Sequence, residues 1–140
     1  MMIDKLLRVS DKQAVTATAA STDVIDFGQT NPNTGMDYRS NMVVTVSEAA
    51  AAAGAATVTF VVQDSANNST FADVVAFGPV SKDSLKAGAQ VVIPMPTRLR
   101  RYCRLNYVVG SGSLTAGRFS AHVGAGIQQN DPQPDSPRIA

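Results

Sequence analysis

Apolar and polar residues alternate with a period of two in five segments of this chain, and this pattern constrains the fold more than any other feature. Successive side chains of a β-strand point to opposite faces of a sheet, so the alternation predicts half-buried antiparallel strands. Three further segments, at residues 23–27, 73–77 and 101–109, raise the expected number of strands to about eight. The apolar members of the five segments are Val15, Ala17 and Ala19; Met42, Val44 and Val46; Val58, Phe60 and Val62; Val91, Ile93 and Met95; and Phe119, Ala121 and Val123.

Segments with turn-forming residues separate these runs. They lie at residues 30–35, 64–69, 86–88 and 110–112, and each contains Gly, Pro, Asn, Asp or Ser. A parallel α/β fold needs crossover connections of about a dozen residues or more, usually helices, and the spacing leaves no room for them. We therefore expect an all-β fold, a jelly-roll-like antiparallel β-sandwich of about eight strands. The alanine-rich segment 48–53 lacks an apolar face, and we expect a loop or a single turn there.

The composition agrees with an all-β fold, because the charged residues that favour helices are scarce. Charged residues make up 16% of the chain, against a usual figure of about 25%, and Glu48 is the single glutamate. The length of 140 residues suits one domain. We expect a sandwich domain over residues 12–124, preceded by an N-terminal arm over residues 1–11 and followed by an extended, proline-containing tail over residues 125–140.

Charge and cysteine content exclude several classes of function. A net charge of +1 provides no field that attracts nucleic acid or an anionic membrane, so we expect neither as a direct partner. The single Cys103 cannot form an internal disulfide, and with His122 as the single histidine a Cys/His metal site is excluded. We expect no cofactor and no enzyme activity, because the alternation places His122 on the exposed face of its strand, without a buried acid to orient it. The charged start of the chain is a poor secretory signal, and we expect a soluble protein.

Four of the twelve basic residues fall between positions 98 and 104, which is the most uneven feature of the charge distribution. If the alternation of this segment continues upstream, one face carries Arg98, Arg100, Tyr102, Arg104 and Asn106, and the other carries Leu99, Cys103, Leu105, Tyr107 and Val109. Arg101 breaks the phase, as at a β-bulge. Two interpretations stay open: a solvated face whose arginines pair with local acids, or a face that docks on a partner.

The two ends of the chain are further contact candidates. Ile3, Leu6 and Leu7 are apolar at helical spacing, and they either pack back onto their own domain or dock on another chain. The tail contains Pro132, Pro134 and Ile139 among polar residues. It cannot bury enough apolar surface to fold alone, so we expect it to be extended or to lie on a partner.

Several short motifs, taken in their order along the chain, resemble those of a known family. They are Met-Ile-Asp-Lys-Leu at residues 2–6, Gln-Ala-Val-Thr-Ala-Thr-Ala at 13–19 with its continuation through Ser21 to Gly28, Leu-Lys-Ala-Gly at 85–88, and Arg-Tyr-Cys-Arg-Leu-Asn-Tyr at 101–107. Together they resemble the capsid cement, or decoration, proteins of short-tailed bacteriophages. The resemblance extends from residue 2 to about residue 124.

This resemblance implies a jelly-roll structural protein of the virion with no catalytic residues, made in the host cytoplasm and bound to the outer surface of the capsid. There it would staple neighbouring subunits of the major capsid protein against internal pressure. A homodimer at capsid symmetry axes is expected, since two-fold contacts are the commonest. The residues expected to dock on the capsid are Arg98, Arg100, Tyr102, Arg104, Ile3, Leu6, Leu7, Pro132, Pro134 and Ile139.

The competing class is a receptor- or carbohydrate-binding β-sandwich appendage of a virion. Sugar sites usually present aromatic rings for stacking, and this chain has no Trp and three Tyr. The aromatic content therefore favours the capsid interpretation.

Overall fold

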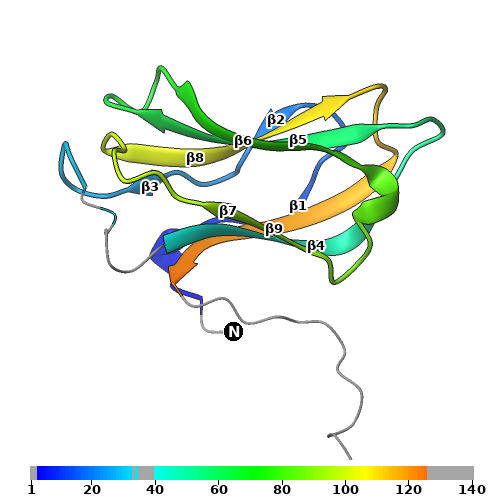
Figure 1. The fold of residues 1–140 in the computed structure, drawn as a ribbon, viewed down its shortest axis with the longest axis horizontal. Helices are drawn as coiled ribbons and strands as arrows, with labels where there is room; N and C mark the ends of the chain where they lie inside the picture. Colours follow the sequence, from blue (N-terminus) through cyan, green and yellow to red (C-terminus); the bar gives the residue numbers. More distant parts are fainter. Residues whose placement is uncertain (1–2, 33, 35–39, 126–140) are drawn as a thin grey trace, which may run out of the picture.

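The computed structural model describes residues 3–32, 34 and 40–125, which form two antiparallel sheets packed face to face (Figure 1). None of the helical segments within these ranges is long and apolar enough to cross a membrane. The elements in chain order are the 3-10 helix η1 (Lys5–Leu7), β1 (Arg8–Ala14), β2 (Ala19–Ala20), β3 (Ile25–Asp26), β4 (Ser40–Ala51), β5 (Thr57–Ser65), β6 (Ala72–Ser81), the 3-10 helix η2 (Lys82–Ser84), β7 (Gln90–Pro94), β8 (Tyr102–Gly110) and β9 (Ala116–Ala125).

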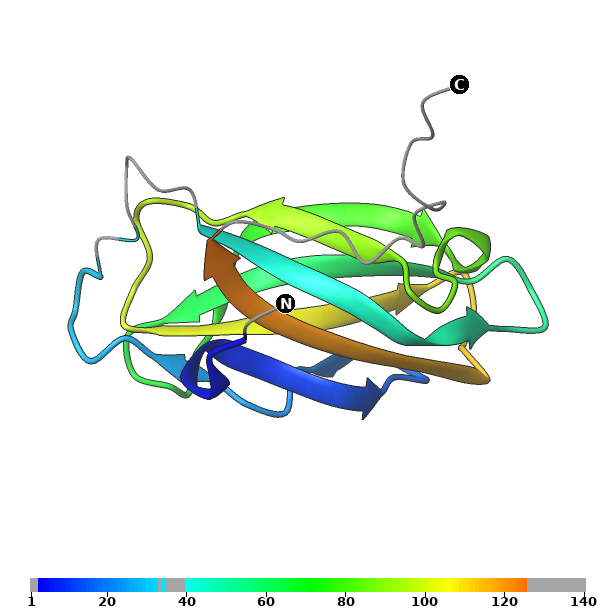
Figure 2. The same ribbon diagram turned by 90° about the horizontal axis from the view of Figure 1, so that it is seen from below.

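The strand order confirms the expected jelly-roll-like sandwich. One sheet, called sheet A here, has the order β1-β9-β4-β7, and the other, sheet B, has the order β2-β8-β5-β6. The short strands β2 and β3 both pair with β8 at successive positions, so the nine strands occupy eight places. Figure 2 shows how the long strands β4 and β9 of sheet A run side by side, in agreement with their continuous antiparallel register from Ser40↔Ala125 to Val46↔Phe119.

Two segments differ from the sequence prediction, and irregular pairing explains the first. The first strand lies at residues 8–14 rather than from Val15 onward, so residues 8–11 belong to sheet A and the described part of the arm is residues 3–7. Register shifts on both sides of Ser10, together with a positive φ of 47° at Lys12, interrupt the alternation that would have marked this strand.

The second difference is the alanine-rich segment, which is strand rather than loop. β4 continues to Ala51 and pairs with β9 through Glu48↔Arg118 and Ala51↔Ala116. Register shifts follow Val46 and Glu48, so the segment shows no simple alternation. Pairing with β9 thus outweighs the low strand propensity of alanine.

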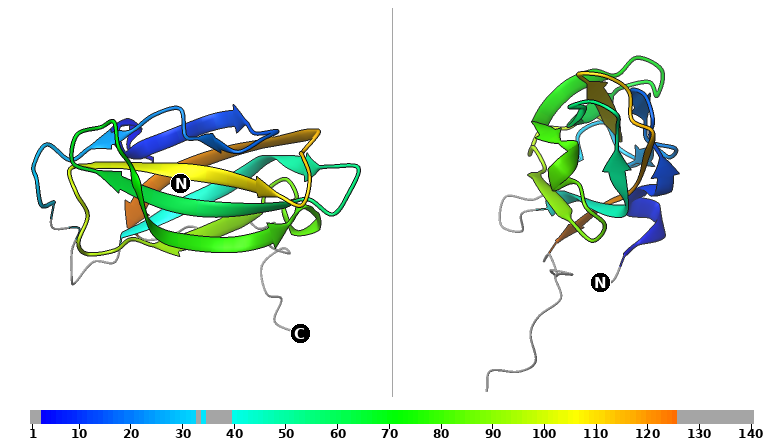
Figure 3. Two further views of the ribbon diagram at one scale, coloured as in Figure 1. Left: turned by 90° about the horizontal axis from the view of Figure 1, so that it is seen from above. Right: turned by 90° about the vertical axis from the view of Figure 1, so that its right-hand side faces the viewer.

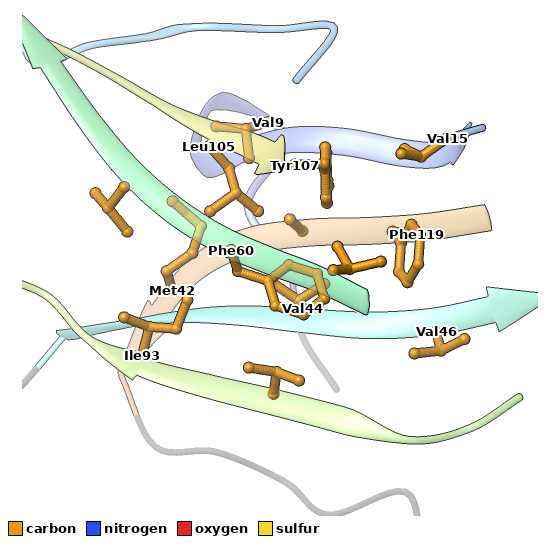
Figure 4. Packing of buried hydrophobic residues seen from close by; sticks show 14 of the residues in the cluster. Val9, Val15, Met42, Val44, Val46, Phe60, Ile93, Leu105, Tyr107 and Phe119 are labelled. Atoms are coloured by element: carbon orange, nitrogen blue, oxygen red, sulfur yellow. The ribbon is translucent and has the colours of Figure 1, made fainter. Parts of the chain in front are cut away.

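Three aromatic rings fill the centre of the core between the sheets (Figure 4). The rings of Phe60, Tyr107 and Phe119 are fully buried and lie 5.5–5.9 Å apart, two of the pairs edge-to-face and the third stacked. The Tyr107 hydroxyl donates a hydrogen bond of 2.8 Å to Ser10 Oγ, which in turn donates to Gln13 Oε1 at 2.9 Å. The one polar atom of this ring cluster is therefore satisfied, and its hydrogen bond joins β8 of sheet B to β1 of sheet A.

A charged side chain fixes the connection that leads into β8. Asp64, at the end of β5, is nearly buried, and its Oδ1 accepts hydrogen bonds from Arg100 Nε and Nη2 at 3.0 and 2.7 Å. Its Oδ2 accepts from the Arg100 backbone N–H at 2.9 Å. The preceding residue, Leu99, is buried in the core. Through its side chain and its backbone N–H, Arg100 thus holds the connection between β7 and β8 against the end of sheet B.

We expect the Asp64–Arg100 contact to stabilise the fold more than the exposed ion pair between Asp26 and Arg101. Asp64→Asn should lower the free energy of unfolding by about 2 kcal/mol, because a buried charged acceptor of three hydrogen bonds is replaced by a neutral amide. Asp26→Asn is the matched control and should change it little, since both partners are about half exposed. Urea unfolding measures both, and equal losses would contradict the assignment.

Burial of Cys103 predicts a loss of stability at alkaline pH. Desolvation raises the pKa of the Cys103 thiol from 9.0 to about 12. As the pH rises above 9, the unfolded thiol ionises while the folded one does not, which favours unfolding by about 2 kcal/mol at about pH 10.5. The free energy of unfolding of Cys103→Ala should therefore fall less between about pH 8 and 10.5 than that of the wild type. An identical fall in both proteins, measured by urea unfolding, would show that the thiol is not protected.

Candidate interaction surfaces

The alternation predicted for residues 102–107 is confirmed. Cys103, Leu105 and Tyr107 are fully buried in the core, whereas Tyr102 and Arg104 are half-buried on the other side of β8, the outer face of sheet B. Figure 3 (left) shows this sheet from outside, with β8 between the short strands β2 and β3 on one side and β5 on the other.

The predicted arginine ladder does not extend upstream of Tyr102. The strand begins there, so Arg98 and Arg100 lie in the connection between β7 and β8 rather than on the strand face. The cause is the contact described above, because Arg100 turns toward Asp64 and its backbone N–H is bound by the same carboxylate. Leu99 is nevertheless buried, as the alternation predicted.

Arg104 is held within the outer face of sheet B by its neighbours. Its Nε donates to Gln63 Oε1 at 2.8 Å, and Gln63 Nε2 donates to Asp73 Oδ1 at 2.6 Å. Its guanidinium lies over the ring of Phe71, 3.8 Å from the ring centroid. The charge of Arg104 is thus engaged by an aromatic ring and by a hydrogen-bond chain that ends on an acid.

Arg101, which the sequence marked as out of phase, pairs with β3. Its Nε and Nη2 donate to the two carboxylate oxygens of Asp26 at 2.8 and 3.0 Å, and its guanidinium lies 5.2 Å from the centroid of the Tyr102 ring. The hydrogen bond from Arg101, with that from the Gly28 backbone, lowers the pKa of Asp26 below its usual value.

The arginine cluster thus matches the first interpretation, pairing with local acids, at Arg100 and Arg101, whereas Arg104 contacts Gln63 and the ring of Phe71. Arg98 is exposed and its backbone takes part in an isolated β-bridge, but its side chain has no ion pair or hydrogen bond with another described residue. It lines an open hollow of about 500 Å³ together with Asn31, Pro32, Thr97, Leu99 and Arg100. Sequence reasoning missed Asp26 and Asp64 as partners, although each lies in or beside a segment that it had marked as strand.

The N-terminal arm leaves two of its apolar side chains in water. Leu6 is 82% exposed and Ile3 is 48% exposed, whereas Leu7 is half-buried and packs against the core. The turn is capped by Asp4, whose carboxylate accepts a hydrogen bond of 2.9 Å from the Leu6 backbone N–H. Of the three apolar candidates Ile3, Leu6 and Leu7, Leu7 is therefore the one that packs back onto its own domain.

The start of β1, the end of β9 and the Arg98 hollow lie at one end of the sandwich. The register pairs Arg8 at the start of β1 with His122 near the end of β9, and Ser40 at the start of β4 with Ala125. The Met95 backbone N–H donates to Ser40 O at 3.0 Å, which brings the connection that carries Arg98 to the same end. Figure 1 shows η1 and the arrowhead of β9 together at the left of the lower sheet. Pro132, Pro134 and Ile139 lie outside the described residues.

His122 is the one candidate whose exposure was predicted wrongly. It lies on the outer face of sheet A, as the alternation required, but it is 4% exposed. Its neighbours in the register are Arg8 and Val43, and its ring lies against Gly124, where an added Cβ would be 3.5 Å from the ring. Burial lowers the pKa of His122, so its neutral form is favoured.

Comparison with known proteins places the chain in a family. No curated protein matches it. Among solved structures, that of the PBSX exported protein XepA is similar at 18% sequence identity and a TM-score of 0.39, covering 91% of this chain and 42% of XepA, so this chain spans less than half the length of XepA. The family model Bbp16 matches residues 9–123, which is most of the chain. The chain therefore belongs to the Bbp16 family.

Proposed function

We propose that this protein is a capsid cement protein, which binds the outer surface of a phage head and staples neighbouring subunits of the major capsid protein against the pressure of the packaged genome. Membership of the Bbp16 family and the jelly-roll strand order support this proposal. The motifs at residues 2–6, 13–28, 85–88 and 101–107 support it as well, through their resemblance to decoration proteins of short-tailed phages.

The observation that carries the proposal is the exposed apolar arm. Leu6 and Ile3 are exposed beside a turn capped by Asp4, at the end of the sandwich where β1 begins and β9 ends. Contiguous exposed apolar patches mark interaction sites, whereas single exposed apolar side chains are ordinary, and we propose that Leu6 and Ile3 form such a patch. A cement protein needs contacts of this kind, because it gains affinity by covering apolar surface on the shell.

To staple neighbouring capsid subunits, each cement assembly must make two or more contacts with the shell. A two-fold homodimer at capsid symmetry axes supplies two copies of each contact, and linked contacts multiply affinity by about 10²–10⁴. Modest contacts at the arm and at the Arg98 hollow are then sufficient for lasting attachment, which suits a chain of low net charge.

Three aromatic residues are poorly placed for the carbohydrate-binding alternative, while Phe77 on β6 is 43% exposed. Tyr107 is fully buried, and the rings of Tyr102 and Phe71 are covered by the guanidinium groups of Arg101 and Arg104. A sugar ring would have to displace these cations before it could stack. This arrangement favours the capsid surface as the partner.

We expect the purified full-length protein to bind phage heads that lack cement protein and to leave a glycan panel unbound. Sedimentation of the protein with bare heads and with decorated heads measures the first, since decorated heads should have no free sites. Saturable binding to a glycan, without binding to bare heads, would replace the cement proposal with the carbohydrate alternative.

Leu6→Ser should weaken binding to bare heads about tenfold or more and leave the thermal unfolding midpoint nearly unchanged. The reason is that full burial of a leucine side chain contributes about 1.5–3 kcal/mol, while in the free protein this side chain is 82% exposed. Phe77→Thr is the matched control, because it removes the exposed aromatic side chain of β6 on the other sheet. Equal affinities of wild type and Leu6→Ser would remove the arm from the interface.

A further inference from the structure

We propose that the hollow around Arg98 binds an acidic segment of the shell protein, and that the Arg98 guanidinium binds a carboxylate of this segment. This inference rests on the proposed cement function and adds to it the chemistry and the place of one contact. The hollow is formed by the loop at Asn31 and Pro32 and by the connection from Thr97 to Arg100.

The first argument is charge. No Asp or Glu is among the described residues that line the hollow, and the nearest acid in the hydrogen-bond network, Asp64, is already bound to Arg100 through both carboxylate oxygens. The Arg98 side chain has no partner in the described part of the chain. The other arginines of the cluster are paired, so Arg98 is the cation left to bind an external anion.

The second argument is the supply of further hydrogen-bond donors. The Arg100 side chain uses Nε and Nη2 for Asp64, and Nη1 has no partner among the described residues. Asn31 and Thr97 are also among the residues that line the hollow, and neither side chain has a hydrogen bond inside the described part of the chain. Two guanidinium groups, an amide and a hydroxyl suit a carboxylate, which accepts several hydrogen bonds at once.

The third argument is that the site is already ordered. Leu99 is 3% exposed and Pro32 is buried, so the hollow has an apolar base that strengthens hydrogen bonds to an ion. On one side of Arg98, the Pro96 carbonyl accepts a hydrogen bond of 2.8 Å from Thr34 Oγ1. On the other side, the Arg100 backbone is bound by Asp64. A ligand therefore pays little conformational entropy to order this connection.

The matched variants Arg98→Gln and Arg118→Gln test the inference on bare heads. Both remove one exposed arginine charge, but Arg118 lies on sheet A, where it pairs with Glu48. Arg98→Gln should weaken binding about tenfold and reduce its dependence on salt, as expected for the loss of a charge-assisted hydrogen bond. Arg118→Gln should bind as the wild type does. Equal binding by Arg98→Gln and wild type would overturn the inference and leave the cement function intact, whereas failure of the wild type to bind bare heads would overturn both.

A second measurement examines the hollow without the phage head. A capped peptide of alternating Asp and Gly is titrated into the ¹⁵N-labelled full-length protein, with a peptide of alternating Lys and Gly as the control. Saturable amide shifts should concentrate at Asn31 and at residues 97–100 and should disappear in Arg98→Gln. Shifts that are absent, or that are the same in Arg98→Gln, would overturn the assignment of the hollow as a carboxylate site.

Discussion

The contact among Phe60, Tyr107 and Phe119 is the constraint on which the two-sheet arrangement depends. These rings come from β5, β8 and β9, so one cluster ties both sheets together. The Tyr107 hydroxyl extends the link to β1 through Ser10, and Gln13 Nε2 carries it on to the Ala20 carbonyl at 2.8 Å. With the sheets fixed in this way, the loops at each end of the sandwich are held in defined positions, which a binding surface requires.

The alternation in the sequence correctly predicted the buried and outward faces of regular strands, where burial alone determines which residues are apolar. The β8 residues Cys103, Leu105 and Tyr107 lie where the alternation places them, because the strand is regular and has neighbours on both sides. The prediction failed in β1, where register shifts break the period of two, and in β4, where pairing with β9 extends the strand through alanines. Bulges and pairing partners are properties of the assembled sheet, and one strand's sequence does not encode them locally.

The candidate surface was predictable in composition but not in geometry. The concentration of arginines between positions 98 and 104 is visible in the sequence, and so are the apolar residues of the arm. Which arginine stays unpaired depends on the acids of other strands, Asp26 from β3 and Asp64 from β5, which are far away in the chain. The exposure of Leu6 likewise depends on how η1 sits beside the sandwich. Long-range contacts thus decide which candidates are available to a partner.

The start of β1, the end of β9 and the Arg98 hollow share one end of the sandwich, which leaves the opposite end outside the proposed docking surface. The turn after β8 lies at that opposite end, and Ser111, Gly112 and Ser113 are all exposed there. Gly112 has a positive φ of 116° in an exposed turn with no heavy atom within 4 Å of an added Cβ, so the surroundings tolerate extra chain. In the proposed assembly, a foreign peptide inserted at this turn would be displayed at the end of the sandwich opposite the docking surface, so the two ends could be engineered separately.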